Sequence, residues 1–92
     1  GLDSDAISEE CVDNALAFLA LLPSDISMPE ASASSDGTVD WHWRNEQYAA
    51  TVTFFKNGQL AYYAQGDDGV AKDSYKFNGS IPDELVQYLR QL

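Results

Sequence analysis

His42 is the residue of this 92-residue chain best suited to acid–base work near neutral pH, and it lies between Trp41 and Trp43. An unperturbed imidazole titrates near pH 6.5, so a His can act as a general base, a metal ligand or a pH sensor. No nucleophile elbow, zinc-ligand cluster or Gly-rich phosphate loop accompanies it. We therefore expect His42 to be a partly exposed strand residue, with a catalytic or pH-sensing role as the alternative.

The single cysteine and the acidic loops add little chemistry. Cys11 falls among apolar residues, with no Lys or Arg near it in sequence to favour a thiolate, which is typical of a buried Cys. A lone cysteine cannot form an internal disulfide. Asp67-Asp68-Gly69, with Asp73 following, lacks the spaced acids of a Ca²⁺ loop and predicts an ordinary turn. The sequence therefore predicts no enzyme activity, no cofactor and no metal site.

The net charge of −10 is unevenly placed along the chain. Nine acidic residues and no Lys or Arg lie between Gly1 and Trp43, whereas Arg44–Leu92 holds six acids and five bases. Direct nucleic-acid binding needs Lys or Arg to neutralise phosphates, and an anionic membrane would also repel this charge. We expect neither partner. A basic protein remains a candidate, and charge that only keeps the protein in solution is the simpler alternative.

The first 37 residues predict a helix followed by a connector. Ile7, Cys11, Ala15, Phe18 and Leu22 recur at helical spacing, and acids fill the first turns, which predicts a helix over 3–22. Pro23 ends it. The longest apolar run, Ala15–Leu22, is far shorter than a membrane span. Two prolines and five serines over 23–37 indicate a connector without regular structure.

The rest of the chain predicts a β-meander over 38–78 and a second helix over 80–92. The expected strands are Thr38–Trp43, Tyr48–Phe55, Gln59–Ala64 and Ala71–Asn78. Ser80 is the expected N-cap of the helix, with Asp83 completing a capping box. This order predicts one α+β domain over 1–92, with both helices packed on one face of a four-stranded antiparallel sheet.

The strand register follows from keeping apolar and polar residues on separate faces. A three-residue loop at Lys56-Asn57-Gly58 pairs Phe54 with Leu60, Val52 with Tyr62 and Ala50 with Ala64 on one face. It requires Gly58 in a left-handed bulge position. The polar loop Arg44–Gln47 then pairs Trp43 with Tyr48 and Trp41 with Ala50.

The opposite face of the predicted sheet is the most informative feature for function. It carries aromatic side chains among threonines, and aromatics are enriched at the centres of interfaces. The alternative is that exposed aromatics only stabilise cross-strand pairs. The predicted partner-binding residues are Phe55, Tyr63, His42, Thr51 and Thr53.

Several short motifs resemble a loose group of small, acidic, uncharacterised bacterial proteins. They are Pro23 and Pro29, Asp36-Gly37, Trp41-His42-Trp43, Thr51-Val52-Thr53-Phe54, Asn57-Gly58, and Ile81-Pro82-Asp83-Glu84-Leu85. Proteins of this group are built as helix, connector, β-meander and helix. The resemblance implies that fold and a bacterial cytoplasmic setting, and it brings no catalytic residues.

The favoured hypothesis is a non-enzymatic protein–protein interaction or regulatory module. It would bind an unidentified protein partner or form a homodimer through the outer sheet face. The first alternative is a nucleic-acid mimic or an antitoxin- or immunity-like inhibitor, which needs acids clustered on one face. The second is a small ligand-binding domain, which needs a concave polar pocket near His42.

Overall fold

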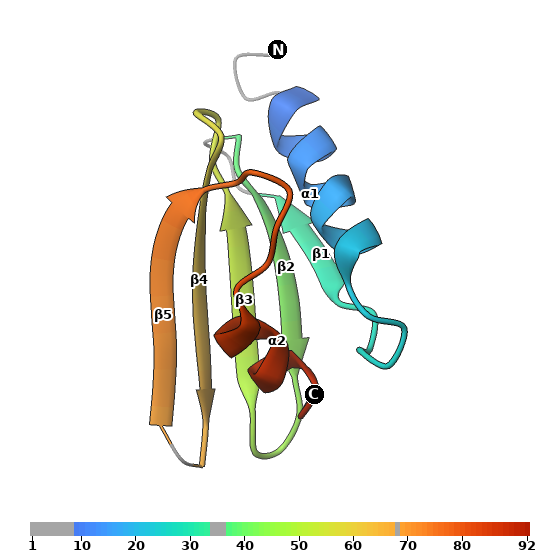
Figure 1. Cartoon of the computed structure of the whole chain (residues 1–92), viewed down its shortest axis with the longest axis vertical. Coiled ribbons are helices and arrows are strands. Elements are labelled where there is room, and N and C mark those ends of the chain that lie inside the picture. Colours follow the sequence, from blue (N-terminus) through green and yellow to red (C-terminus); the bar gives the residue numbers. More distant parts are fainter. Residues whose placement is uncertain (1–8, 34–36, 68) are drawn as a thin grey trace.

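Two helices lie on one face of a five-stranded antiparallel sheet (Figure 1). The computed structural model describes residues 9–33, 37–67 and 69–92. The elements are α1 (Glu9–Leu21), β1 (Glu30–Ala33), β2 (Val39–Arg44), β3 (Ala49–Phe54), β4 (Gln59–Gly66), β5 (Gly69–Lys76) and α2 (Asp83–Leu89). The strands follow one another in chain order, so the expected α+β class and antiparallel meander are confirmed.

Helix α1 packs a narrow stripe against the sheet. Cys11, Ala15 and Phe18 are buried, and their spacing of four and three residues places them on one side of the helix. The neighbouring apolar residues Val12 and Leu16 are exposed, so they lie outside the buried stripe. The helix ends at Leu21, ahead of Pro23, close to the predicted end. The predicted first turns at 3–8 lie outside the described residues.

Strand β1 corrects the expected connector over 23–37 and raises the strand number from four to five. It lies along the free edge of β2, where Glu30 pairs with His42, Ala31 with Trp41 and Ala33 with Val39. All four of its residues are exposed. Its sequence, Glu-Ala-Ser-Ala, lacks the β-branched and aromatic residues that mark a strand. Its pairing with β2 is a tertiary effect that overrides weak local strand propensity.

The registers of the two central hairpins agree with the predicted core face. Between β3 and β4, Phe54 pairs with Leu60 and Val52 with Tyr62, as predicted, and Gly58 has the expected positive φ of 84°. Between β2 and β3, Trp41 pairs with Val52 rather than with Ala50. The shift is two residues, so the side chains stay on their predicted faces.

Asn45 explains the two-residue shift. Its side-chain oxygen accepts hydrogen bonds from the backbone N–H groups of Gln47 (2.9 Å) and Tyr48 (2.8 Å). Its own N–H donates to the carbonyl of Tyr48 (2.9 Å), which closes the loop one residue later than predicted. Arg44 thereby joins β2 instead of the loop.

The hairpin between β4 and β5 is tighter than expected. Gly66 pairs directly with Gly69, so both strands run beyond their predicted limits of Ala64 and Ala71. The ring of Tyr48 lies directly on Gly66, and a Cβ at this position would overlap Cε2 and Cδ2 of Tyr48. A side chain at position 66 would therefore force the Tyr48 ring to move.

Replacing Gly66 by Ala is expected to lower the free energy of unfolding by about 1–3 kcal/mol, because the methyl group overlaps the Tyr48 ring. Urea titration measures the loss. In a Tyr48→Ala background, the same substitution should cost much less. An equal cost in both backgrounds would show that the overlap is not the cause.

Helix α2 is shorter than the predicted 80–92, and its predicted capping box is wrong. The N-cap position is Pro82, with no side-chain cap. Ser80 instead donates both its hydroxyl (2.7 Å) and its N–H (3.2 Å) to the side-chain oxygen of Asn78. Leu85 and Leu89 are fully buried and hold the short helix on the sheet.

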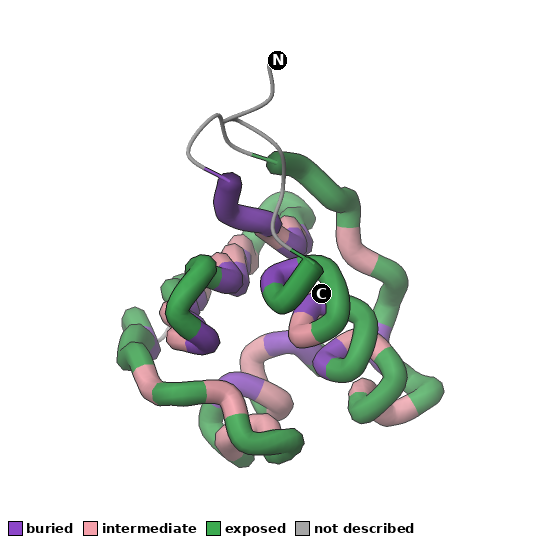
Figure 2. The backbone as a smooth tube through the Cα atoms, turned by 90° about the horizontal axis from the view of Figure 1, so that it is seen from above, coloured by how far each residue is buried: buried purple, intermediate pink, exposed green. Residues whose placement is uncertain are grey.

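The core lies between the helices and the inner face of the sheet, where the buried stretches of backbone gather (Figure 2). Three phenylalanines meet at its centre: Phe18 lies 5.5 Å from Phe54 and 6.2 Å from Phe77, measured between ring centroids. A side-chain hydrogen bond also connects the sheet to α1, because the indole N–H of Trp41 donates to the Ala15 carbonyl at 3.0 Å. Within the described chain, no helix is long and apolar enough to cross a membrane.

Tyr62 on the inner face makes the fold sensitive to alkaline pH. Burial, followed by a hydrogen bond to Glu84 (3.2 Å) and the charge of that carboxylate, raises its pKa from 10.0 to about 12. The folded state therefore holds this proton more tightly than the unfolded chain does. The corresponding stability is fully present below pH 10 and is lost as the pH rises through about 12.

We expect the urea midpoint of the wild type to fall more than that of Tyr62→Phe between neutral pH and about pH 11.5. Burial also raises the pKa of Tyr75. Its contribution is common to both proteins, so the difference between them isolates Tyr62. Parallel falls in the two proteins would contradict this assignment.

Candidate interaction surface

The outer face is the side of the sheet that points away from both helices. The cross-strand pairs order its residues into rows, of which two cross all five strands. One row consists of Glu30, His42, Thr51, Tyr63 and Lys72, and the other of Ser32, Asp40, Thr53, Ala61 and Ser74. The other paired residues of this face are Arg44, Ala49, Gln59, Gln65, Val70 and Lys76. Phe55 directly follows β3 and continues its alternation onto this face, with its backbone bonded to Gln59.

The five residues expected to bind a partner all lie on the outer face. Tyr63 is 45% exposed and Phe55 is 37% exposed, while His42, Thr51 and Thr53 are half-buried between them and the edge of the sheet. Phe55 follows the last residue of β3, and its N–H donates to the Gln59 carbonyl at 2.9 Å. Val70, 53% exposed, is an apolar member of this face that the sequence did not reveal, because the last strand was expected to begin at Ala71.

His42 is held at both ring nitrogens by hydroxyl groups. Its Nε2 lies 2.8 Å from Ser32 Oγ, and its Nδ1 lies 3.2 Å from Thr51 Oγ1. Ser32 also donates to Asp40 Oδ2 at 3.4 Å. A catalytic triad needs a carboxylate on the ring nitrogen opposite the nucleophile, and here that place is taken by Thr51. The network therefore fixes the ring on the sheet in an arrangement that differs from a Ser-His-Asp triad.

Ser32 is a member of this network that the sequence did not reveal. It lies in the segment expected to be a connector, and only the pairing of Ser32 with Asp40 brings it beside the histidine.

Cys11 is fully buried, as expected of an unreactive thiol. The described residues contain no group of three His, Cys, Asp or Glu side chains placed to hold a metal ion.

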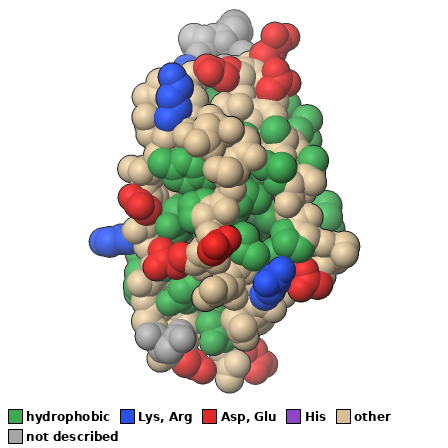
Figure 3. All heavy atoms as spheres, viewed as in Figure 1, with side chains coloured by type: hydrophobic (Ala, Val, Ile, Leu, Met, Phe, Trp, Pro, Cys, Tyr) green, Lys and Arg blue, Asp and Glu red, His purple; other side chains and the backbone are tan. Residues whose placement is uncertain are grey.

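The outer face does not share the strong negative charge of the protein. Three of the chain's five bases lie on it, namely Arg44, Lys72 and Lys76, against the two acids Glu30 and Asp40. The helix side carries acidic side chains at both ends and across its middle (Figure 3). A strongly basic partner would therefore be drawn to α1, where Glu9, Glu10 and Asp13 lie, rather than to the outer face.

Both edges of the sheet are poor sites for adding another strand. β1 has only four residues. β5 is longer, but it carries Lys72, Asp73 and Lys76, and charged side chains discourage edge-to-edge pairing. The broad outer face, rather than either edge, is the surface suited to contact.

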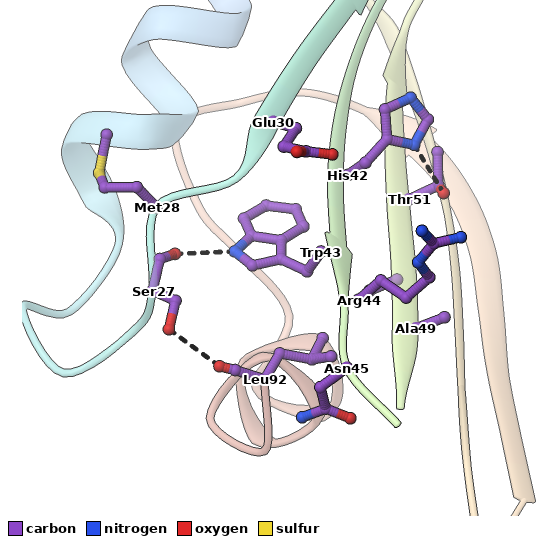
Figure 4. A pocket seen from close by; sticks show the side chains of 11 residues that line it. Ser27, Met28, Glu30, His42, Trp43, Arg44, Asn45, Ala49, Thr51 and Leu92 are labelled. Carbon is purple, nitrogen blue, oxygen red and sulfur yellow. Dashed lines mark hydrogen bonds between the residues drawn. The ribbon is translucent and has the colours of Figure 1, made fainter. Parts of the chain in front are cut away.

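A notch of about 650 Å³ opens at the end of the sheet, beside the last residues of β2 (Figure 4). It exists because β1 pairs with β2 only as far as His42, which leaves the β2 edge open at Arg44. The Trp43 indole lies beside it and donates to the Ser27 carbonyl at 2.8 Å. The lining residues are Ser27, Met28, Glu30, His42, Trp43, Arg44, Asn45, Ala49, Ala50, Thr51 and Leu92.

No protein-family model, curated protein or solved structure matches this chain. The resemblance to small acidic bacterial proteins, inferred from turn residues and the tryptophan pair, therefore stays a prediction.

Proposed function

We propose that this chain is a non-enzymatic interaction module of the bacterial cytoplasm that binds a protein partner through its outer face. The observation that carries the proposal is the uncovered sheet face, with exposed Tyr63, Phe55 and Val70 amid a nearly balanced set of charges. Interfaces combine an aromatic centre with a polar rim in this way. The rest of the protein has the high negative charge that discourages indiscriminate association.

The centre of the outer face is held in place before any partner arrives. The Tyr63 hydroxyl donates to Gln65 at 3.2 Å, and Thr51, its cross-strand neighbour, is linked to His42. Side chains that are already ordered lose less entropy when they bind. This supports a contact role over that of aromatics left at the surface by chance.

Replacing Phe55 and Tyr63 together by Asp tests the proposal. Both side chains are substantially exposed, so we expect the free energy of unfolding to change by no more than about 1 kcal/mol. Capture of the partner from cells of the source organism should fall at least about tenfold, because two charges would enter an aromatic contact.

The matched control places two new carboxylates on α1, at Leu16 and Leu21, which are 54% and 46% exposed. This control should retain the captured partner. If Phe55→Asp with Tyr63→Asp captures the same partner as the wild type at equal yield, the outer face is not the binding surface.

The structure supports one of the two alternative functions, the ligand-binding domain, better than the other, the nucleic-acid mimic. A nucleic-acid mimic needs regularly spaced carboxylates on one face, and the described acids are spread over α1, β1, β2, β5, α2 and the loops. That distribution does not support mimicry. A ligand-binding domain needs a polar hollow near His42, and the notch provides one of a size typical for small molecules.

The notch suits a small zwitterion, because Glu30 and Arg44 both line it beside the apolar Met28 and Leu92. Free leucine is a suitable probe, with fluorescence of Trp43 or amide NMR shifts as the readout. Saturable changes at Trp43 that disappear in Arg44→Ala would favour this second function. Unchanged spectra would remove leucine as a ligand of the notch.

A further inference from the structure

The outer face has two electrically different sides. Its acids, Glu30 and Asp40, lie on β1 and β2, whereas Lys72 and Lys76 lie on β5 at the other edge of the sheet. Between them, β3 and β4 present neutral side chains such as Thr51, Tyr63 and Ala61. A surface with an acidic flank, a neutral centre and a basic flank is complementary to itself when it is turned around.

We propose that the partner of the outer face is a second copy of this chain, packed face to face. The twofold axis is parallel to β3 and lies midway between the two outer faces. This inference rests on the proposed function, because it names the partner of the same surface. A twofold axis parallel to the strands places β1 and β2 of one copy over β5 and β4 of the other. An axis across the strands would instead set β5 against β5 and bring lysines together.

The row of the outer face that runs from Glu30 to Lys72 shows how the residues match. Turned around the axis, Glu30 lies opposite Lys72 of the second copy, and His42 lies opposite Tyr63 of the second copy. Thr51 lies at the centre of the row, opposite Thr51 of the second copy. Arg44, the cation that breaks the acidic side, lies opposite the neutral Gln65 of the second copy. The arrangement therefore brings no like charges together in these rows.

The two flanking charges are available for such a contact. Among the described residues, the structure places neither Glu30 nor Lys72 in a salt bridge within its own chain, whereas Arg90 binds Asp25 at 3.2 Å. Each dimer would form the Glu30–Lys72 contact twice because the axis repeats it. Tyr63 and Phe55 would supply the apolar centre.

The size of the sheet limits the strength of the dimer. With strands about 4.8 Å apart and a rise of about 3.4 Å per residue, five strands cover roughly 500 Å² per copy. A standard interface buries about 800 Å² per partner. The net charge of −10 on each copy also opposes association, although salt screens it beyond about 8 Å. We therefore expect a weak dimer, with a dissociation constant in the micromolar range.

Charge exchange between Glu30 and Lys72 tests the arrangement, with sedimentation equilibrium of the full chain at physiological ionic strength as the measurement. Lys72→Glu alone and Glu30→Lys alone should each weaken dimerisation at least about tenfold, because like charges then meet twice. An equimolar mixture of the two variants should form a heterodimer, and the double variant should recover the wild-type dissociation constant.

The controls are Lys56→Glu and Glu46→Lys, which change the net charge by the same amounts outside the outer face. The dissociation constant of each control should stay within about twofold of that of the wild type, unlike those of the single exchanges. A wild type that stays monomeric up to millimolar concentration overturns the dimer. So does a mixture of the two variants that fails to associate.

The two proposals can fail separately. A monomeric wild type whose captured partner is lost in Phe55→Asp with Tyr63→Asp leaves the outer face as the binding surface and removes only the second copy. A dimer that is unaffected by both the charge exchanges and the aromatic replacements removes the outer face as well.

Discussion

Replacing Phe18 by Ala is expected to lower the free energy of unfolding by about 3–5 kcal/mol. Phe18 is fully buried and joins α1 to the sheet through its edge-on contact with Phe54, 5.5 Å away, and its contact with Phe77, 6.2 Å away. Phe54 and Phe77 are themselves 6.0 Å apart, so the remaining pair cannot fill the vacated space without moving. Small domains have only about 5–15 kcal/mol of stability in total.

Urea titration followed by circular dichroism measures this loss, and Leu16→Ala on the exposed side of α1 is the control. We expect the control to stay within about 0.5 kcal/mol of the wild type, since Leu16 is 54% exposed. If Phe18→Ala and Leu16→Ala were equally stable, the phenylalanine cluster would not be what holds α1 to the sheet.

Replacing Trp43 by Ala is the second substitution with a large expected effect, again about 3–5 kcal/mol. Trp43 is only 4% exposed, and its indole N–H binds the Ser27 carbonyl at 2.8 Å. Ser27 in turn donates its hydroxyl to the carbonyl of Leu92 at 2.9 Å. These two hydrogen bonds connect β2 to the segment after α1, and that segment to Leu92 beyond the end of α2.

Trp43→Phe separates the two contributions of the indole. It keeps most of the apolar contact but removes the N–H donor, so it should cost only about 1–2 kcal/mol, including the carbonyl left without its partner. Hydrogen exchange should rise in residues 23–29 and 90–92 in the Ala variant. A Phe variant as unstable as the Ala variant would show that the hydrogen bond, and not packing, dominates.

The sequence predicted the two helices, the meander of four strands that follows β1, and the faces on which the residues of those four predicted strands lie. These features depend on local periodicity, which is strong for Cys11, Ala15 and Phe18 in α1 and for Val52 and Phe54 in β3. The β3–β4 register was predictable because a slip of one residue would bury threonines. A slip of two residues keeps every side chain on its face, so the β2–β3 register was not determined in the same way.

The missed features depend on contacts between distant segments. β1 has no β-branched or aromatic residue and forms because the edge of β2 offers unpaired backbone groups to Glu30–Ala33. Ser80 does not cap α2 because Asn78 binds both its hydroxyl and its N–H. The close fit of Tyr48 over Gly66 likewise joins two hairpins that no short motif connects.

The candidate surface likewise combines residues placed by local periodicity with residues placed by contacts between distant segments. Alternation alone placed His42, Thr51, Thr53 and Tyr63 together on the outer face. The hydroxyl contact of Ser32 with His42 and the acidic flank formed by Glu30 required β1 and were not predictable. The charge therefore had to be mapped in three dimensions, where the outer face proved nearly balanced within an acidic protein.

Site-specific photocrosslinking from position 63 in cells of the source organism tests the central claim most directly. A photoreactive phenylalanine analogue would replace Tyr63 in the full chain, with the same analogue at Leu16 as the control on the helix side. We predict a discrete protein adduct from position 63 that is absent from position 16. A mass of twice 10.1 kDa would identify a second copy, and any other mass a different partner. No adduct from position 63, or equal adducts from both positions, would contradict the assignment of the outer face as the binding surface.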